Sequence, residues 1–231
     1  MKERLVTSLT VLLLAGLFVV SLPLASPAQQ AADSSQQQEI VEKARLTFQS
    51  FMRDEKMSWL QQNISEAKAL LIIPSILKGG FIVGGSGGSG VLVVKDPETG
   101  LWTHPGFYTI GSVSFGLQIG GEAAEVIMLV RTGRALTNLY TSSLKLGGDV
   151  SVTAGPVGMG AKSAIVADIV SFARSKGVYA GLSLEGALIK IRNEWNEIYY
   201  GQPVTPVDIF VKQEVENLGA QDLIRAVSAA D

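Results

Sequence analysis

The stretch GGFIVGGSGGSGVLVV, residues 79–94, decides the fold of this chain because it combines dense glycine with strand-forming residues. Seven of its sixteen residues are glycine, and the others include neither proline nor a charged residue. Glycine removes side chains where two backbones, or a backbone and a ligand, must approach closely. Valine and isoleucine on both flanks favour extended structure. The pattern predicts two strands around a glycine-rich loop, whose glycines are Gly84, Gly85, Gly87, Gly88 and Gly90.

Two glycine motifs in the chain resemble nucleotide-binding signatures but lack the context that these require. Residues 85–90, GSGGSG, satisfy the G-x-G-x-x-G pattern, yet the apolar run at 91–94 predicts a strand where that site needs a helix. Residues 155–163, GPVGMGAKS, resemble a phosphate-binding loop, but Ala161 interrupts the required G-K-S run. Both motifs indicate structural glycine, and we expect no cofactor.

The amino terminus has the pattern of a secretory signal peptide. Lys2 and Arg4 precede an apolar run at 9–20, and Ser26-Pro27-Ala28 supplies small residues before a cleavage point. We expect residues 1–28 to be removed; a retained anchor is the alternative, but the apolar run is short for a spanning helix. The chain has no cysteine, which excludes disulfides, a lipidated cysteine and thiolate metal sites. These features predict an exported protein, periplasmic or secreted.

The charge balance of the mature chain argues against a nucleic-acid binder. Lys2, Arg4 and Glu3 leave with the signal peptide, so 17 basic residues face 20 acidic ones in the remaining 203 residues, a net charge of −3. An electrostatic nucleic-acid interface needs a basic excess. Attraction to an anionic membrane would have to come from a local basic patch.

The mature chain is expected to form one α+β domain. Residues 29–38, QQAADSSQQQ, are polar and low in complexity, which predicts a disordered leader before a domain at 39–231. A helix is expected from Glu39, with an apolar face made by Ile40, Ala44, Phe48 and Phe51.

The strand pattern predicts a sheet. An apolar segment at 67–73 ends at Pro74, and residues 126–130 form a continuous apolar strand. Three further stretches alternate apolar and polar side chains, as antiparallel strands solvated on one side do: residues 111–119, 144–154 and 178–185. The prediction is a curved, glycine-rich antiparallel sheet or barrel-like sheet with helices packed against it.

Few residues could carry catalysis. His104 is the single histidine, it lies beside Pro105, and no G-x-S-x-G nucleophile turn is present. A zinc ion would need carboxylates and one imidazole, an unusual set, so no metal site is assigned. Glu122 and Glu125 border a strand, where such a pair is usually solvated rather than an acid–base pair. We expect a protein that is not an enzyme and has no catalytic residues.

Basic residues in apolar or glycine-rich surroundings are the candidate binding residues. They are Lys68 and Lys78 around Pro74, Arg131 and Arg134 after the strand at 126–130, and Lys162, Arg174 and Lys176 near the last sheet region. If the sheet curves so that these positions converge, they would form a site for a phosphate-bearing head group. The alternative is a set of scattered, solvated positions.

Four blocks of sequence occur in an order that is similar to that of a known family. They are AKALLIIPSILKGGFIVGGSGGSGVLVV from residue 67, FYTIGSVSFGLQIGGEAAEVIMLV from 107, LKLGGDVSVTAGPVG from 144, and ARSKGVYAGLSLEGALI from 173 with YYG at 199–201. On these blocks, which cover residues 67–201, the chain resembles an exported, bacterial-type member of the SYLF domain family, a lipid-binding and actin-associated family.

The resemblance implies a non-enzymatic lipid-binding module. Eukaryotic members bind phosphoinositides and fungal members bind actin, and for an exported protein the resemblance implies anionic membrane lipids rather than actin. By their position in the blocks, the implied head-group contacts are Lys68, Lys78, Arg174 and Lys176, on a protein peripheral to the membrane. The alternative is a structural or protein-interaction module of the cell envelope that does not bind lipid.

Overall fold

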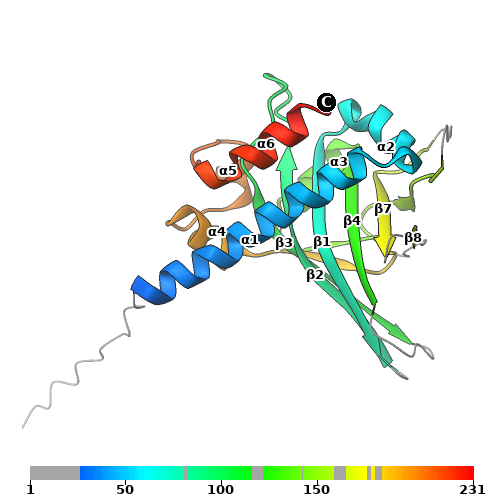
Figure 1. Ribbon diagram of the computed structural model, residues 1–231, viewed down its shortest axis with the longest axis horizontal. Coiled ribbons are helices and arrows are strands. Elements are labelled where there is room, and N and C mark those ends of the chain that lie inside the picture. The colour runs from blue at the N-terminus through cyan, green and yellow to red at the C-terminus, as the bar shows by residue number, and fades with distance from the viewer. Residues whose placement is uncertain are drawn as a thin grey trace, which may run out of the picture.

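A long, curled β-sheet forms the centre of the structure, a computed structural model, and helices pack against both of its faces (Figure 1). The strand order is β5-β9-β3-β2-β1-β4-β7-β6, with β8 paired to β7. The predicted α+β class, with a curved sheet and packed helices, is confirmed. The structure describes residues 27–80, 83–115, 122–141, 143–158, 165–175, 178–179 and 184–231.

The described part of the chain begins and ends with helices, and its strands form two consecutive groups, β1 to β4 and β5 to β9, separated by α3. The strands are β1 (Ala69–Gly80), β2 (Val83–Val94), β3 (Gly106–Phe115), β4 (Glu122–Val130), β5 (Ser143–Lys145), β6 (Val152–Ala154), β7 (Ile169–Ser175), β8 (Val178–Tyr179) and β9 (Leu188–Ile191). The α-helices are α1 (Pro27–Met52), α2 (Ser58–Asn63), α3 (Gly133–Leu139), α4 (Asn193–Tyr200), α5 (Pro206–Phe210) and α6 (Gln221–Ser228). Three short 3-10 helices are η1 (Glu55–Met57), η2 (Ile64–Glu66) and η3 (Leu218–Ala220).

The glycine-rich stretch lies in a central strand, which corrects the predicted loop. The glycines at 84, 85, 87, 88 and 90 belong to β2, which pairs with β1 on one side and with β3 on the other. Residues 81–82, at the expected bend, lie outside the described residues. The expected close approach of two backbones does occur at these glycines, but it lies within a paired strand rather than at a bend.

That close approach occurs where β1 is irregular. Pro74 does not end the strand; the pairing of β1 with β2 shifts register between Ile72 and Ser75. Proline has no N–H to donate to a strand ladder, so it is tolerated at such a bulge. A Cβ on Gly90 would overlap the carbonyl oxygen of Ile72, and one on Gly88 would overlap that of Ser75. Only glycine lets β2 follow β1 past the bulge.

Both faces of the sheet are buried where the helices cover it, whereas the alternating pattern predicted one solvated face. On one face Leu71, Met128 and their neighbours pack with α3 and α5. On the other face Leu70, Ile127 and their neighbours pack with α1, α2, α4 and α6. The end of β1 and the beginnings of β2 and β4 project beyond the helices (Figure 1). Leu77 is exposed in this part of β1.

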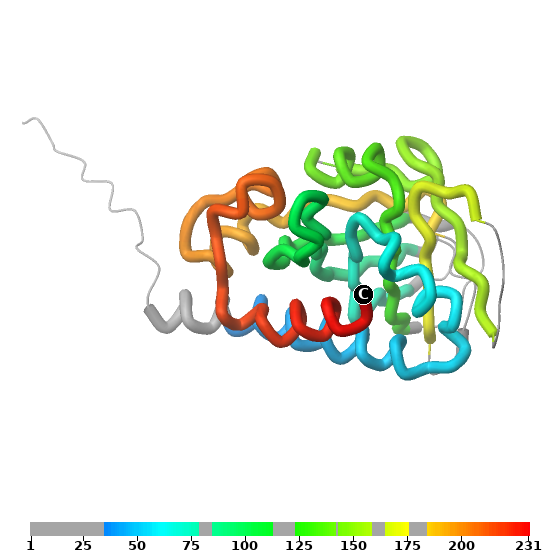
Figure 2. Tube along the Cα trace, turned by 90° about the horizontal axis from the view of Figure 1, so that it is seen from above, coloured from blue at the N-terminus to red at the C-terminus, as the bar shows by residue number. Residues whose placement is uncertain are grey.

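Helix α1 begins at Pro27, upstream of the predicted start at Glu39, so residues 29–38 are helical rather than a structureless leader. Gln37 is buried, and the Gln38 amide donates a hydrogen bond of 2.9 Å to the carbonyl oxygen of Gly219. The predicted apolar face packs on the sheet, since Phe48 and Phe51 are fully buried. Helix α6 lies beside α1 (Figure 2).

One predicted strand is divided in the structure, and a second lies mostly outside the described residues. Residues 144–154 form β5 and β6 with a turn between them, in which Gly147 has a φ of +77°. Strand β6 pairs with β7 in parallel, so the sheet is mixed rather than purely antiparallel. In the stretch 178–185 the structure shows β8 at 178–179, and residues 180–183 lie outside the described part of the chain.

We expect Gly90→Ala to lower the free energy of unfolding by about 1–3 kcal/mol, because the methyl group overlaps the β1 backbone. Gly87→Ala is the matched control on the same strand, since its Cβ would meet nothing closer than the Ile110 carbonyl oxygen at 3.7 Å. The control should be neutral or stabilise by up to about 1 kcal/mol through its effect on the unfolded chain. Urea denaturation of both variants measures the difference, and equal losses would contradict the assigned role of Gly90.

Candidate anion-binding site

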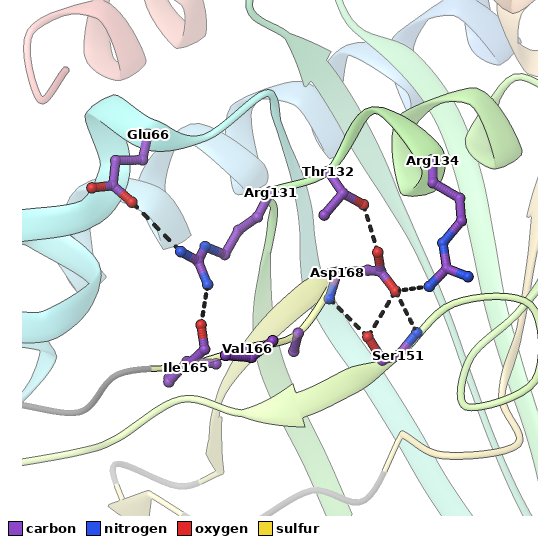
Figure 3. Close-up of a pocket in the computed structure, with 9 residues that line it drawn as sticks. Glu66, Arg131, Thr132, Arg134, Ser151, Ile165, Val166 and Asp168 are labelled. Carbon is purple, nitrogen blue, oxygen red and sulfur yellow. Dashed lines mark hydrogen bonds and ion pairs between the residues drawn. The ribbon is translucent and has the colours of Figure 1, made fainter.

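A pocket of about 530 Å³ lies where β4 leads into α3, next to the start of β7 (Figure 3). It brings together two arginines, two carboxylates and an apolar edge from segments far apart in the chain. Its lining residues are Glu66, Arg131, Thr132, Arg134, Ser151, Ile165, Val166, Ala167 and Asp168.

The carboxylate of Asp168 organises the pocket. It accepts hydrogen bonds from the hydroxyl of Thr132 at 2.7 Å, and from the backbone N–H and hydroxyl of Ser151 at 2.9 and 2.7 Å. It also binds the guanidinium of Arg134. Asp168 is only 6% exposed, so its charge requires these partners. Thr132 in turn caps α3, because its hydroxyl accepts from the N–H of Ala135 at 3.2 Å.

Burial acts to raise the pKa of Asp168, but hydrogen bonds from Thr132, Ser151 and Arg134 outweigh it and hold the pKa well below its usual range. The side chain therefore stays ionised at any physiological pH. Its acceptor positions are occupied by protein donors, which makes Asp168 a scaffold for the pocket rather than a proton donor or a free ligand.

The guanidinium groups of the two arginines differ in their exposure to solvent and in their hydrogen-bond partners. The side chain of Arg134 is 63% exposed and is tied to Asp168. Arg131 is 26% exposed; it donates to the carbonyl oxygen of Ile165 and lies 3.6 Å from a carboxylate oxygen of Glu66. Figure 3 shows Arg131 between Glu66 and the Asp168–Arg134 pair. A guanidinium has five N–H donors, so both side chains keep donors for an anion.

Aliphatic side chains form the edge of the pocket beside the arginines. Val166 is fully exposed and Ile165 is partly buried. Exposed apolar side chains next to cationic ones are the combination that peripheral membrane proteins use, with the charge on the head group and the aliphatic group in the interface.

Of the four residues implied by the sequence blocks, Lys68 and Lys78 do not converge. The N–H of Lys68 donates to the Val130 carbonyl oxygen at 2.8 Å, which places this exposed residue beside the strand end that leads to Arg131, although it does not line the pocket. Lys78 lies ten residues further along β1, about 33 Å away at the usual strand rise, opposite Ser86 of β2. The two lysines cannot hold one head group.

Arg174 is engaged within the protein. Its guanidinium donates to Glu125 at 2.9 Å and to Ser50 at 2.7 Å, and it lies 4.8 Å above the ring of Phe51. These contacts tie the end of α1 to β4 and β7, and they show Glu125 as an ion-pair partner rather than a solvated rim residue. Lys176 and Lys162 lie outside the described residues. Head-group contact by Lys68, Lys78, Arg174 and Lys176 stays a prediction.

His104 occupies a structural position. Its Nδ1 accepts a hydrogen bond of 3.2 Å from the N–H of Asn217, and burial lowers its pKa. Across the described segments, no group of three or more histidine, aspartate and glutamate side chains could hold a metal ion.

Arg131 and Arg134 are candidate residues on the sequence alone, and the structure brings them together in one pocket. The other residues of the pocket, among them Glu66, Ser151, Val166 and Asp168, were not predicted. A signal existed for Asp168, because a lone acid in the apolar run AIVADIVSF demands a buried partner. Nothing in the sequence indicated that Ser151 would be this partner, because Ser151 reaches Asp168 only when β6 pairs with β7.

Comparison with known proteins gives one family and several relatives. Residues 111–230 match the family model described as "Ysc84: Las17-binding protein actin regulator". The chain is 32% identical over 165 residues to SH3 domain-containing YSC84-like protein 1 of Homo sapiens, covering 69% of this chain and 48% of that protein. It is 36% identical over 149 residues to LAS seventeen-binding protein 3 of Saccharomyces cerevisiae, covering 62% of this chain and 32% of that protein. The chain thus spans about half the length, or less, of the curated relatives that it matches.

We expect Asp168→Asn to lower the free energy of unfolding at neutral pH by about 2–3 kcal/mol, because charge-assisted hydrogen bonds are lost. The folded pKa of Asp168 is depressed, so its stabilisation is complete above the unfolded pKa of about 3.9 and is lost as pH falls below it. The difference in free energy of unfolding between the parent protein and the variant should therefore decrease below about pH 4. Denaturant titrations across pH measure this. Asp222→Asn, at an exposed position, is the control. A difference in free energy of unfolding between the parent protein and Asp168→Asn that is constant with pH would contradict the role assigned to ionised Asp168.

Proposed function

This chain belongs to the Ysc84 (SYLF) domain family, and we propose that it is a non-enzymatic module that binds the phosphate groups of phospholipids on an anionic membrane surface. The observation that supports the proposal is the pocket itself, in which Arg131 and Arg134 lie beside the fully exposed Val166. Guanidinium groups bind phosphate oxygens through planar, bidentate hydrogen bonds.

A local site suits this protein better than a general attraction. The whole chain carries a net charge of −2, so it is not drawn to an anionic surface by its overall field. Basic residues near such a surface contribute about 1 kcal/mol each. Arg131 and Arg134, with the exposed Lys68 beside the same end of the sheet, would contribute enough for weak, salt-sensitive association.

The protein would act from the membrane surface. Among the described residues no helix is long and apolar enough to cross a bilayer. With the predicted signal peptide, we propose export to the periplasm or the exterior and peripheral attachment. Anionic membrane lipid is then the partner, and an exported protein would not meet actin.

A second function, protein interaction, is favoured by a different observation. Leu101, Val211 and Leu218 are all exposed. Val211 follows α5 and Leu218 begins η3. Between them the Gln213 amide donates a 2.6 Å hydrogen bond to Asp96, in the connection that carries Leu101. The family description names an actin regulator that binds Las17. These exposed apolar side chains would contact a protein partner in place of, or in addition to, lipid.

The parent protein should co-sediment with anionic vesicles and not with neutral ones, and the binding should weaken as salt is raised. Arg131→Gln should reduce the affinity about fivefold, the effect of losing about 1 kcal/mol. Arg225→Gln, exposed on α6 outside the pocket, is the matched control and should bind as the parent does.

The same vesicle assay tests whether Lys68 and Lys78 contribute to binding. Lys68→Gln should reduce binding less than Arg131→Gln, and Lys78→Gln should leave it unchanged. No binding of the parent protein to any vesicle would exclude the lipid proposal and leave protein interaction as the function.

A further inference from the structure

The pocket contains a negative charge that simple phosphate binding does not explain. Glu66, on η2, is 61% exposed at its side chain and approaches Arg131 at 3.6 Å, beyond hydrogen-bond distance. At that exposure and distance the ion pair contributes little to stability. A carboxylate at this place would repel a purely anionic ligand by its charge.

The two carboxylates of the pocket differ in what they can offer. Asp168 is buried and accepts from Thr132, Ser151 and Arg134. Glu66 makes no hydrogen bond to the described residues that line the pocket, so its oxygens are open to a donor from a ligand. The pocket thus presents two cationic groups and, on the far side of Arg131 from Arg134, one available anionic group (Figure 3).

We propose that the pocket selects a phosphate ester that also carries a primary ammonium group, as an ethanolamine phosphate does. The phosphate binds between Arg131 and Arg134, and the ammonium donates hydrogen bonds to Glu66. This inference rests on the proposed function in that it names the head group which the same pocket takes. It also holds for a soluble ester of the same chemistry.

A primary ammonium fits better than a quaternary one. Quaternary ammonium groups are recognised by the faces of aromatic rings, and the residues that line this pocket include no phenylalanine, tyrosine or tryptophan. A primary ammonium has three N–H donors, and a carboxylate is the acceptor it binds most strongly. Because Glu66 lies close to Arg131, the two charges of the ligand must be near each other, as a two-carbon linker places them.

The test uses two soluble probes that differ by the amine alone, O-phosphorylethanolamine and ethyl phosphate, titrated calorimetrically into the parent protein and Glu66→Gln. The parent should bind O-phosphorylethanolamine more tightly. In the variant the affinity for O-phosphorylethanolamine should fall about two- to fivefold, and that for ethyl phosphate should rise by a similar factor, as expected for an exposed charge pair. Glu98→Gln, exposed in the β2–β3 connection, is the matched control and should change neither.

The directions in which Glu66→Gln changes the affinities for the two probes test the proposed ammonium contact. If Glu66→Gln raises the affinity for both probes, Glu66 is only a competitor of the phosphate and the inference is wrong. If the parent binds neither probe, or binds both equally, the inference is also wrong.

Vesicles with and without phosphatidylethanolamine, at equal content of anionic lipid, form the second arm. Binding of the soluble probe with no binding to either vesicle would support the ammonium phosphate site and exclude the membrane function. Equal binding to both vesicles, with no preference among the soluble probes, would support the membrane function and exclude the ammonium site.

Discussion

The contact on which the sheet depends is the approach of the β2 backbone to the bulge in β1. At Gly88 and Gly90 there is no room for a side chain against the carbonyl groups of Ser75 and Ile72. Strand β1 in turn pairs with β4, and β4 with β7, so this contact lies at the centre of the sheet. Glycine in a strand costs conformational entropy. Here that cost is offset by the apolar residues of the same strands, which are buried on both faces.

The position of the candidate pocket is a consequence of the same sheet. Because β4 and β7 are paired, the residues that follow β4 and those that precede β7 lie next to each other, and the N–H of Arg131 donates to the carbonyl oxygen of Asp168 at 2.8 Å. The carboxylate of Asp168 then holds α3 through Thr132 and β6 through Ser151. The buried carboxylate of Asp168 holds Arg134 by an ion pair, although the side chain of Arg134 is 63% exposed. Arg131 is 26% exposed and donates to the carbonyl oxygen of Ile165, with the exposed Glu66 at 3.6 Å.

The sequence match identifies the family of the chain, whereas the pocket indicates which chemical groups this chain can bind. The sequence match assigns the chain to the Ysc84 (SYLF) family, but the relatives are longer proteins, and their names describe whole molecules. The charged groups in the pocket describe this chain. In the proposed function the arginines beside an exposed valine bind a phosphate at an interface, and in the further proposal the exposed carboxylate narrows the class of head group. The function proposed here therefore depends on these side chains rather than on the properties of relatives.

The sequence by itself determined the α+β class, the apolar face of α1, the extended character of residues 83–94 and the candidacy of Arg131 and Arg134. These are local properties, since periodicity, glycine content and the placement of charge after an apolar strand can be read along the chain. Only the tertiary structure decided that the glycines form a strand, that Arg174 serves an internal ion pair, and that Asp168, Ser151 and Glu66 meet the two arginines. Each of these depends on strand pairing between distant segments. Local sequence does not specify such pairing, because the stabilising contacts exist only after the sheet has formed.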